Sequence, residues 1–206
     1  MLVTDPSAAQ LQVARQRAES LGLTWVRFLV APVEDLPIAS NSVDLVLGST
    51  FLHFTDTAAA IRSMARVTKP GGRVAVSAGL RLEYGGAWRR ALEPVRRVLL
   101  QHGLPYRDPF LPEEDLTSLF ANAGLTIERS HMLPVERLLF PHTDIAIAVP
   151  TQARWIPLLL REAPENLHES MQMESTAELR RAIDDMGLEA ASLGVPMIHL
   201  LARKPS

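Results

Sequence analysis

The sequence of 206 residues contains no cysteine, which excludes disulfides, thiolate metal sites and cysteine nucleophiles. It has no excess of one charge either, because 21 Lys and Arg residues against 23 Asp and Glu residues give a net charge of −2. That balance argues against a nucleic-acid-binding surface. No apolar run reaches the ~18 residues of a membrane-spanning helix, and the first residues do not follow the pattern of a secretory signal. Because a lack of cysteine also fits a reducing compartment, we expect a cytoplasmic protein without a membrane span.

Several catalytic motifs are missing as well. The eleven glycines form neither a G-x-G pattern nor a Walker loop. The absence of G-x-S-x-G disfavours an α/β-hydrolase. The six histidines show no metal-ligand spacing such as H-E-x-x-H, so no metal site is predicted.

What is present is typical of a globular protein. Apolar residues make up 47% of the chain and charged residues 21%, and the length suits one domain. The pattern of apolar residues and the proline content change along the chain. Residues 1–80 alternate between short apolar runs and helical patterns, residues 81–195 are richer in proline and less regular, and residues 195–204 return to a strand-like run. We predict a single domain over residues 1–206.

The first 80 residues alternate between strand and helix patterns. Strands are expected at residues 2–5, 25–30, 43–47 and 73–77. Ser7 and Asp56 are the expected N-caps of two helices, and Pro70-Gly71-Gly72 is expected to end the second helix and turn the chain. This alternation implies βαβ units, which form a mainly parallel sheet with helices on both faces.

The later part of the chain is mostly helical in pattern. Helices are expected at 88–102, with a kink or restart at Pro94, at 112–124, and over most of 151–190, and strands at 125–127 and 195–202.

Four segments of the first 80 residues resemble those of a known family. They are V-T-D-P-S at 3–7, V-E-D-L-P at 33–37, N-S-V-D-L-V-L-G-S-T-F-L-H-F at 41–54 and A-R-V-T-K-P-G-G-R-V-A-V-S at 65–77. Their order and spacing resemble the class I S-adenosylmethionine-dependent methyltransferases, in particular the small-molecule type 11 branch. Beyond residue 80 only residues 111–125 and the last strand look similar. The resemblance implies a Rossmann-like α/β fold, with residues 1–80 as the cofactor-binding core, residues 81–195 as a lid and substrate region, and residues 195–204 as the last strand.

The resemblance also implies where the cofactor, S-adenosyl-L-methionine, would bind. In an open parallel sheet, ligands lie at the carboxyl ends of the strands. The residues expected to bind it are Asp5 at the ribose with Pro6 beside it, Val33 and Glu34 in the loop along the adenine, and Gly48 and Ser49 near the methionine part. His53 is the candidate catalytic base, because histidine titrates near neutrality.

Each of these residues also has a structural interpretation. Asp5 and Pro6 fit the start of a helix, Val33 and Glu34 a solvated loop, Gly48 and Ser49 a tight turn, and His53 a residue that lines the pocket or packs beneath it.

The chain departs from the family pattern in two places. The family has a strand, a glycine-rich turn and a helix before the Val3 strand, and none of these is found here. We therefore expect either an N-terminal truncation or a protein with a degenerate site, with open strand edges, poor folding and weak or absent cofactor binding. Ala31-Pro32 also replaces the usual Gly-Asp of the adenine loop, and proline offers neither a carboxylate nor an N–H. Glu34 or Asp35 is positioned in sequence to compensate.

The expected reaction is methyl transfer to a small-molecule acceptor. An apolar lid containing Trp88, Phe140, Trp155, Leu158 and Leu159 would favour a lipophilic or aromatic acceptor, although these residues fit packing on the sheet equally well. Two alternatives stay open. One is a catalytically inactive, methyltransferase-like binding module, and the other is a nicotinamide-dependent oxidoreductase, which also places an acidic residue at the end of its second strand.

Overall fold

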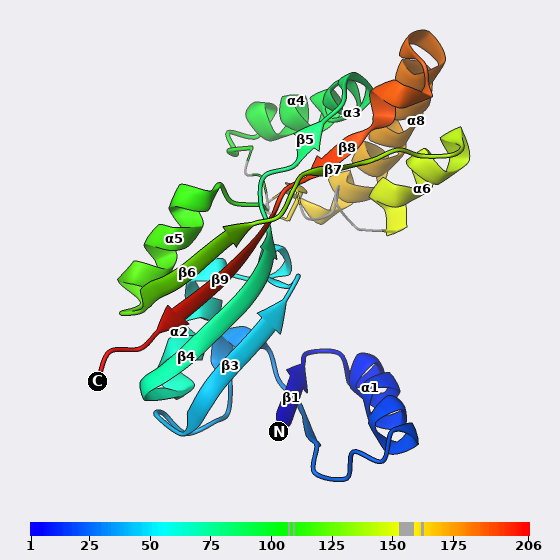
Figure 1. Cartoon of the computed structure of the whole chain (residues 1–206). Helices are drawn as coiled ribbons and strands as arrows, with labels where there is room; N and C mark the ends of the chain where they lie inside the picture. Colours follow the sequence, from blue (N-terminus) through cyan, green and yellow to red (C-terminus); the bar gives the residue numbers. More distant parts are fainter. Residues whose placement is uncertain (107, 109, 153–158, 162) are drawn as a thin grey trace. The chain divides into compact units, whose positions relative to one another are not determined.

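The computed structural model describes residues 1–106, 108, 110–152, 159–161 and 163–206. Contacts within the chain define two compact units (Figure 1). Unit 1 comprises Met1–Ala78, Glu113–His131 and His199–Ser206, and unit 2 comprises Gly79–Pro112 and Met132–Ile198. Two predictions, a single domain over the whole chain and a lid over residues 81–195, depend on how the two units act together. Both stay predictions.

Unit 1 begins with a pair of parallel strands. Strand β1 (Leu2–Asp5) pairs with β2 (Arg27–Val30), and helix α1 (Ala8–Ser20) connects them. Ser7 Oγ accepts a hydrogen bond from the main-chain N–H of Gln10 at 3.3 Å, so Ser7 is the N-cap of α1, as the sequence predicts. The carboxyl end of β1 is therefore fixed at Asp5, directly before the helix.

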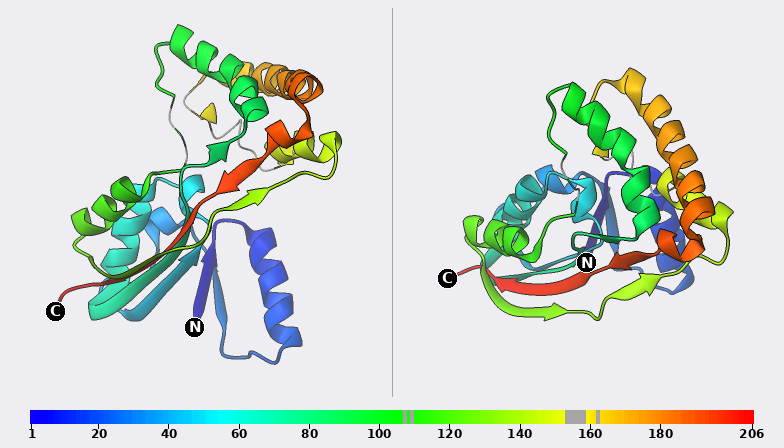
Figure 2. Two further views of the ribbon diagram at one scale, coloured as in Figure 1. Left: turned by 45° about the horizontal axis from the view of Figure 1, so that its top comes forward. Right: turned by 90° about the horizontal axis from the view of Figure 1, so that it is seen from above.

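A second sheet has four strands. Its order is β3 (Val43–Ser49), β4 (Thr68–Gly79), β9 (Met197–Arg203) and β6 (Thr126–Met132), and β3 runs parallel to β4. Helices α2 (Thr57–Val67) and α5 (Glu113–Asn122) cover one face of this sheet (Figure 2). Ile61 of α2, Phe120 of α5 and Val74 of β4 are fully buried. The predicted Rossmann-like α/β fold is confirmed.

The segment K-P-G-G differs from its prediction. Helix α2 ends at Val67, before the expected stop at Pro70-Gly71-Gly72, and residues 70–72 lie inside β4 instead of forming a turn before it. The pairing with β3 passes directly from Val43–Thr68 to Leu45–Arg73, so β4 bulges there. Proline and glycine at 70–72 favour a turn, but β4 continues through them because it pairs with β3 again from Arg73 onward.

The described part of unit 2 contains a small antiparallel sheet and several helices. The strands are ordered β5 (Glu83–Tyr84), β8 (Leu193–Val195) and β7 (Glu136–Leu138), and the helices are α3 (Gly86–Ala91), α4 (Glu93–Gln101), α6 (Thr143–Gln152) and α8 (His168–Met186). The helix expected over 88–102 is divided into α3 and α4 at Leu92, because Pro94 fits only the first turn of a new helix. Within the region 151–190, α8 confirms the helical prediction, whereas residues 153–158 and 162 lie outside the described residues.

Some of the residues predicted for an apolar lid pack inside unit 2. Trp88 is 1% exposed, and Leu159 is 5% exposed in a neighbouring cluster. Phe140 is partly buried against the cluster around Trp88. Trp155 and Leu158 lie outside the described residues. Trp88 and Leu159 are therefore buried within unit 2, and the apolar lid stays a prediction.

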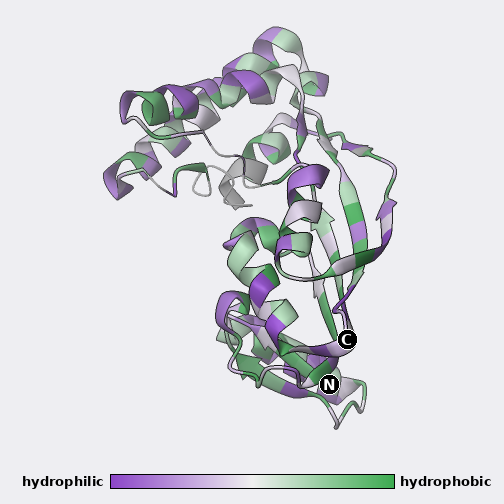
Figure 3. Ribbon diagram, turned by 90° about the vertical axis from the view of Figure 1, so that its left-hand side faces the viewer, coloured by the Kyte–Doolittle hydropathy of each residue, from purple (hydrophilic) through white to green (hydrophobic). Residues whose placement is uncertain are grey.

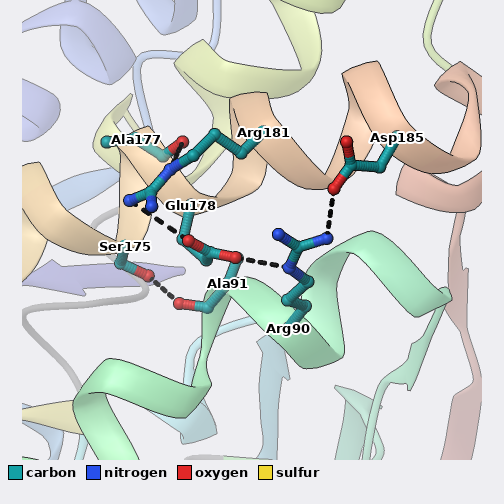
Figure 4. A network of polar contacts seen from close by, with 7 residues as sticks. All are labelled: Arg90, Ala91, Ser175, Ala177, Glu178, Arg181 and Asp185. Carbon is teal, nitrogen blue, oxygen red and sulfur yellow. Dashed lines mark hydrogen bonds and ion pairs between the residues drawn. The ribbon is translucent and has the colours of Figure 1, made fainter.

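A polar network joins α3 to α8 (Figure 4). Arg90 forms ion pairs with Glu178 and with Asp185, the latter at 2.6 Å. Ser175 Oγ donates a hydrogen bond to the main-chain carbonyl of Ala91, and both groups are buried. The network therefore fixes the two helices along more than one turn.

Hydrophilic and hydrophobic residues are interspersed along the ribbon (Figure 3), and α2 and α4 each have a polar and an apolar side. In the part of the chain that the structure describes, no helix is both long enough and apolar enough to cross a bilayer. The same described residues contain no group of three or more acidic or histidine side chains arranged to hold a metal ion.

Candidate functional site

A cavity of about 670 Å³ lies at the carboxyl ends of β1 and β3 in unit 1. Its walls come from the end of β1, the loop after β2, the end of β3 and the segment that follows β3. The six residues predicted to bind the cofactor all line it: Asp5, Pro6, Val33, Glu34, Gly48 and Ser49. The carboxyl ends of β1 and β3, which belong to two separate sheets, bring residues that are distant in sequence to this one cavity.

Asp5 is the last residue of β1 and contributes a half-buried carboxylate to the cavity. Its Oδ1 accepts a hydrogen bond from the main-chain N–H of Ser7 at 2.7 Å, which fixes the side chain at the start of α1. Its Oδ2 accepts no hydrogen bond from any described residue. The two interpretations of Asp5 are thus compatible, since one oxygen shapes the turn and the other is available to a ligand.

The loop after β2 forms a second wall. It continues into a short helix, η1 (Val33–Asp35), and its Ala31 N–H donates to the Asp5 carbonyl at 3.1 Å. Glu34 lines the cavity, and its Oε1 accepts a hydrogen bond from the Asp56 N–H at 3.2 Å. Asp35 is exposed and does not line the cavity. Of the two residues predicted to compensate for Pro32, only Glu34 is therefore in place to do so.

The end of β3 brings main chain and an aromatic ring into close contact. A Cβ added to Gly48 would lie 2.2 Å from Cε1 of Phe51, so only glycine leaves room for that ring. Thr50 follows with a φ of +52°, a conformation that is strained for a β-branched residue. Its N–H donates to the Ser77 carbonyl at 2.8 Å, which helps to hold this conformation. The Gly48–Phe51 contact and the conformation of Thr50 thus fix the main chain at the end of β3, where it lines the cavity.

His53 lies in the short helix η2 (Leu52–Phe54), next to the cavity but not in its lining. Its ring lies against that of Phe54, with the ring centroids 3.9 Å apart. Burial lowers the pKa of its imidazole, so the neutral form extends to lower pH than usual. Its role as the catalytic base stays a prediction.

Several residues of the cavity were not anticipated from the sequence. The rings of Phe51 and Phe54 line it, together with the hydroxyl-bearing Thr4 and Thr55 and the side chain of Met64. The run F-L-H-F directly after a strand end is the one signal that pointed to the two rings. Met64 could not be identified because it appears in sequence as an ordinary core position of α2.

The charges in the cavity are of one sign. Among the described residues that line it, Asp5 and Glu34 are the charged side chains, and none is a lysine or an arginine. Its other walls are apolar or carry hydroxyl groups. Such a cavity suits a ligand that combines a positive charge, hydroxyl groups and apolar surface.

Comparison with known proteins agrees with this geometry. Residues 1–76 match the model of a family described as a methyltransferase domain. The uncharacterized methyltransferase Rv3342 of Mycobacterium tuberculosis is 33% identical over 119 residues, which cover 58% of this chain and 45% of that protein. The ubiquinone/menaquinone biosynthesis C-methyltransferase UbiE of Haemophilus ducreyi is 37% identical over 78 residues, covering 37% of this chain and 30% of the relative. The chain therefore spans less than half the length of these curated relatives.

The solved structures agree on the fold. The crystal structure of a putative methyltransferase from Bacillus halodurans matches all of this chain and 83% of that chain, with a TM-score of 0.61 and 17% sequence identity. At this identity the likeness concerns the fold alone. The resemblance noted in the sequence is therefore confirmed: residues 1–76 are similar to the methyltransferase domain of this family, and the chain has a Rossmann-like fold.

Proposed function

We propose that this protein transfers a methyl group from S-adenosyl-L-methionine to a small-molecule acceptor. The observation that carries the proposal is that all six residues chosen by resemblance line one cavity at the carboxyl ends of two strands. A sulfonium compound supplies a methyl group that is already activated for transfer. The protein's contribution is therefore mainly to position the reactants and to exclude water.

The residues present fit such a cofactor. The unengaged Oδ2 of Asp5 is suited to accept hydrogen bonds from ribose hydroxyls. Val33 and Glu34 would lie along the adenine, and Gly48 and Ser49 would lie beside the methionine part. The acidic character of the cavity complements a positively charged sulfonium group.

The acceptor is proposed to be lipophilic or aromatic. Phe51 and Phe54 give the cavity an apolar wall, on which a flat ring or a hydrocarbon chain would pack. The name of the UbiE relative, which refers to ubiquinone and menaquinone biosynthesis, supports an acceptor of this class. If the accepting atom carries a proton of high pKa, His53 is the proposed base, because burial favours its neutral form.

The test is calorimetric titration of S-adenosylhomocysteine, extended to millimolar ligand, into the 206-residue chain and two variants. Asp5→Asn should weaken binding about tenfold or more, the loss expected when a charged hydrogen-bond acceptor is removed. Asp35→Asn is the matched control, since Asp35 is an exposed acid one residue beyond Glu34 and outside the cavity. Equal binding by all three folded proteins would contradict the assignment of Asp5. No binding by any of them would contradict a cofactor site in this chain.

A binding module without catalysis is the second candidate. Pro32 in the cavity wall favours it, because proline has neither a main-chain N–H nor a carboxylate to offer a ligand. The two candidates differ in turnover. Binding of S-adenosylhomocysteine without methyl transfer to a panel of quinols, phenols and terpenoid acceptors would favour the module. The methyltransferase matches argue against the nicotinamide-dependent oxidoreductase.

A further inference from the structure

Helix α2 and the loop after β2 are neighbouring parts of the cavity wall. Leu36, the residue that follows η1, lines the cavity and is 5% exposed. Met64 of α2 lines the same cavity, and η1 packs against α2. The contacts between this helix and this loop therefore decide how one wall of the cavity is held.

Two prolines limit the main-chain hydrogen bonds that the loop can form by itself. Pro32 and Pro37 have no N–H to donate. The Asp35 N–H reaches the Pro32 carbonyl only at 3.4 Å. The Ile38 N–H donates to the Leu36 carbonyl at 2.8 Å, across a single residue. Buried main-chain groups need partners, so the loop depends on groups from outside it.

Helix α2 supplies those partners. The Oγ of Ser63 accepts a hydrogen bond from the Leu36 N–H at 3.2 Å, and both residues are buried. Arg66, three residues further along the helix, donates through Nη2 to the Leu36 carbonyl. Its Nη1 donates to the Ile38 carbonyl at 2.7 Å. The main chain of Leu36 is therefore held on both sides, by a hydroxyl at its N–H and by a guanidinium at its carbonyl.

The shape of the arginine side chain suits this contact. A guanidinium carries several N–H groups in a fixed plane, so it can hydrogen-bond the carbonyls on both sides of Pro37 at once. A lysine ammonium is a point charge on a flexible stem and does not fix two carbonyls relative to each other in this way. The contact is therefore particular to arginine.

A second arginine on α2 provides a natural comparison. Arg62 lies four residues before Arg66, so the two side chains are neighbours on the helix surface, and both are exposed. Within the described ranges of the chain, Arg62 has no hydrogen bond or ion pair. The two residues match in charge and exposure, but only Arg66 holds the loop.

We propose that Arg66 is a positioning residue for cofactor binding, because it fixes Leu36 and Ile38 and so holds residues 33–38 in the conformation that lines the cavity. The proposal rests on the proposed function. A loop that is already ordered when the cofactor arrives loses less conformational freedom on binding, which strengthens the affinity. Arg66 does not itself line the cavity, so it acts through the main chain of Leu36.

Amide hydrogen exchange tests the first step without any ligand. In Arg66→Met, the amides of Leu36 and Ile38 should exchange about fivefold faster than in the 206-residue chain, because the loop separates from α2 more often. The amides of β4 should keep their rates. Arg62→Met is the matched control and should leave both sets unchanged. Equal exchange of the loop amides in the two variants would overturn the proposal.

Calorimetric titration of S-adenosylhomocysteine tests the second step. Arg66→Met should raise the Kd about fivefold, a loss reduced by the exposure of the guanidinium, and Arg62→Met should leave it unchanged. Lys204→Met controls for stability, because it removes hydrogen bonds to the Ala65 and Thr68 carbonyls near the end of α2 without touching residues 33–38. It should bind as the 206-residue chain does. Arg66→Lys keeps the positive charge near the end of α2 and should restore the affinity only in part.

The outcomes separate this proposal from the proposed function. Faster loop exchange with an unchanged Kd in Arg66→Met would overturn the positioning role and leave the cofactor site in place. An equal rise of the Kd in Lys204→Met and Arg66→Met would mean that affinity follows stability alone, which would also overturn it. No binding of S-adenosylhomocysteine to the 206-residue chain would contradict the proposed function, and this proposal with it.

Discussion

The ammonium group of Lys204 donates a hydrogen bond to Asn41 Oδ1 at 2.7 Å, although 163 positions separate the two residues. The same Nζ also donates to the main-chain carbonyls of Ala65 at 2.8 Å and Thr68 at 2.9 Å. One side chain near the carboxyl terminus therefore satisfies the C-terminal end of α2 and fixes the loop before β3. Lys204, which directly follows β9, thus links three separate segments of unit 1.

Lys204→Met should accordingly destabilise unit 1. The substitution leaves carbonyl groups at the end of α2 without their donor, which is expected to cost about 1.5–3 kcal/mol. Lys69→Met is the matched control, because Lys69 pairs at 2.8 Å with a largely exposed Asp44 and should cost less than about 1 kcal/mol. Urea unfolding of the two variants measures both values. Equal midpoints would show that the Lys204 contacts contribute nothing particular.

Ser175→Ala tests the junction between α3 and α8. Ser175 is 2% exposed, and its hydroxyl donates to the Ala91 carbonyl, so the variant leaves a buried carbonyl unpaired at an expected cost of about 1–3 kcal/mol. Ser170→Ala lies on the same helix, where an exposed hydroxyl bonds to the Leu167 carbonyl, and should cost about 0.5 kcal/mol or less. Thermal unfolding distinguishes the two. A smaller effect at Ser175 than at Ser170 would contradict the structural role given to this hydrogen bond.

Features that depend on neighbouring residues, such as the starts of helices, could be predicted from the sequence. Ser7 and Asp56 were identified as N-caps, and each accepts a hydrogen bond from the first turn of its helix. The K-P-G-G segment was misplaced because its strand pairing depends on β3, which is distant in sequence. The division of the 88–102 helix at Leu92 lay within the expected effect of Pro94, which allowed either a kink or a restart.

In the candidate site, too, local features could be predicted from the sequence and contacts that depend on an unusual backbone conformation could not. Asp5 and Gly48 could be selected from the sequence because each ends a recognisable strand, and both line the cavity. The contact between Gly48 and the Phe51 ring could not be predicted, since it depends on the left-handed conformation of Thr50 between them. No sequence pattern favours that conformation for a threonine.

A pH dependence follows from Glu128 on β6. Hydrogen bonding and charge from Arg73, with a further contribution from Arg203, hold the pKa of Glu128 below its usual value of 4.5. A carboxyl group whose pKa is lower in the folded than in the unfolded state stabilises the fold above pH 4.5, and this contribution is lost as the pH falls through the folded-state pKa. Glu128→Gln should therefore reduce the acid dependence of stability, as measured by urea midpoints between neutral pH and pH 3, roughly the range over which carboxyl groups titrate. Glu19→Gln, an exposed change on α1, is the control, and an unchanged acid slope in Glu128→Gln would contradict the linkage.

Gly48→Ala tests whether the end of β3 and the cavity wall are built as one structure. The new methyl group would collide with Phe51, whose Cε1 would lie 2.2 Å away, so the ring must move. Overpacking of this kind is expected to cost about 1–3 kcal/mol, and the displaced ring should also weaken S-adenosylhomocysteine binding. The double variant Gly48→Ala/Phe51→Ala removes the collision. Its loss of stability should therefore be smaller than the sum of the losses in the two single variants. Additive effects in this cycle, measured by urea unfolding, would mean that Gly48 is required for its backbone alone and not for the close approach of the ring.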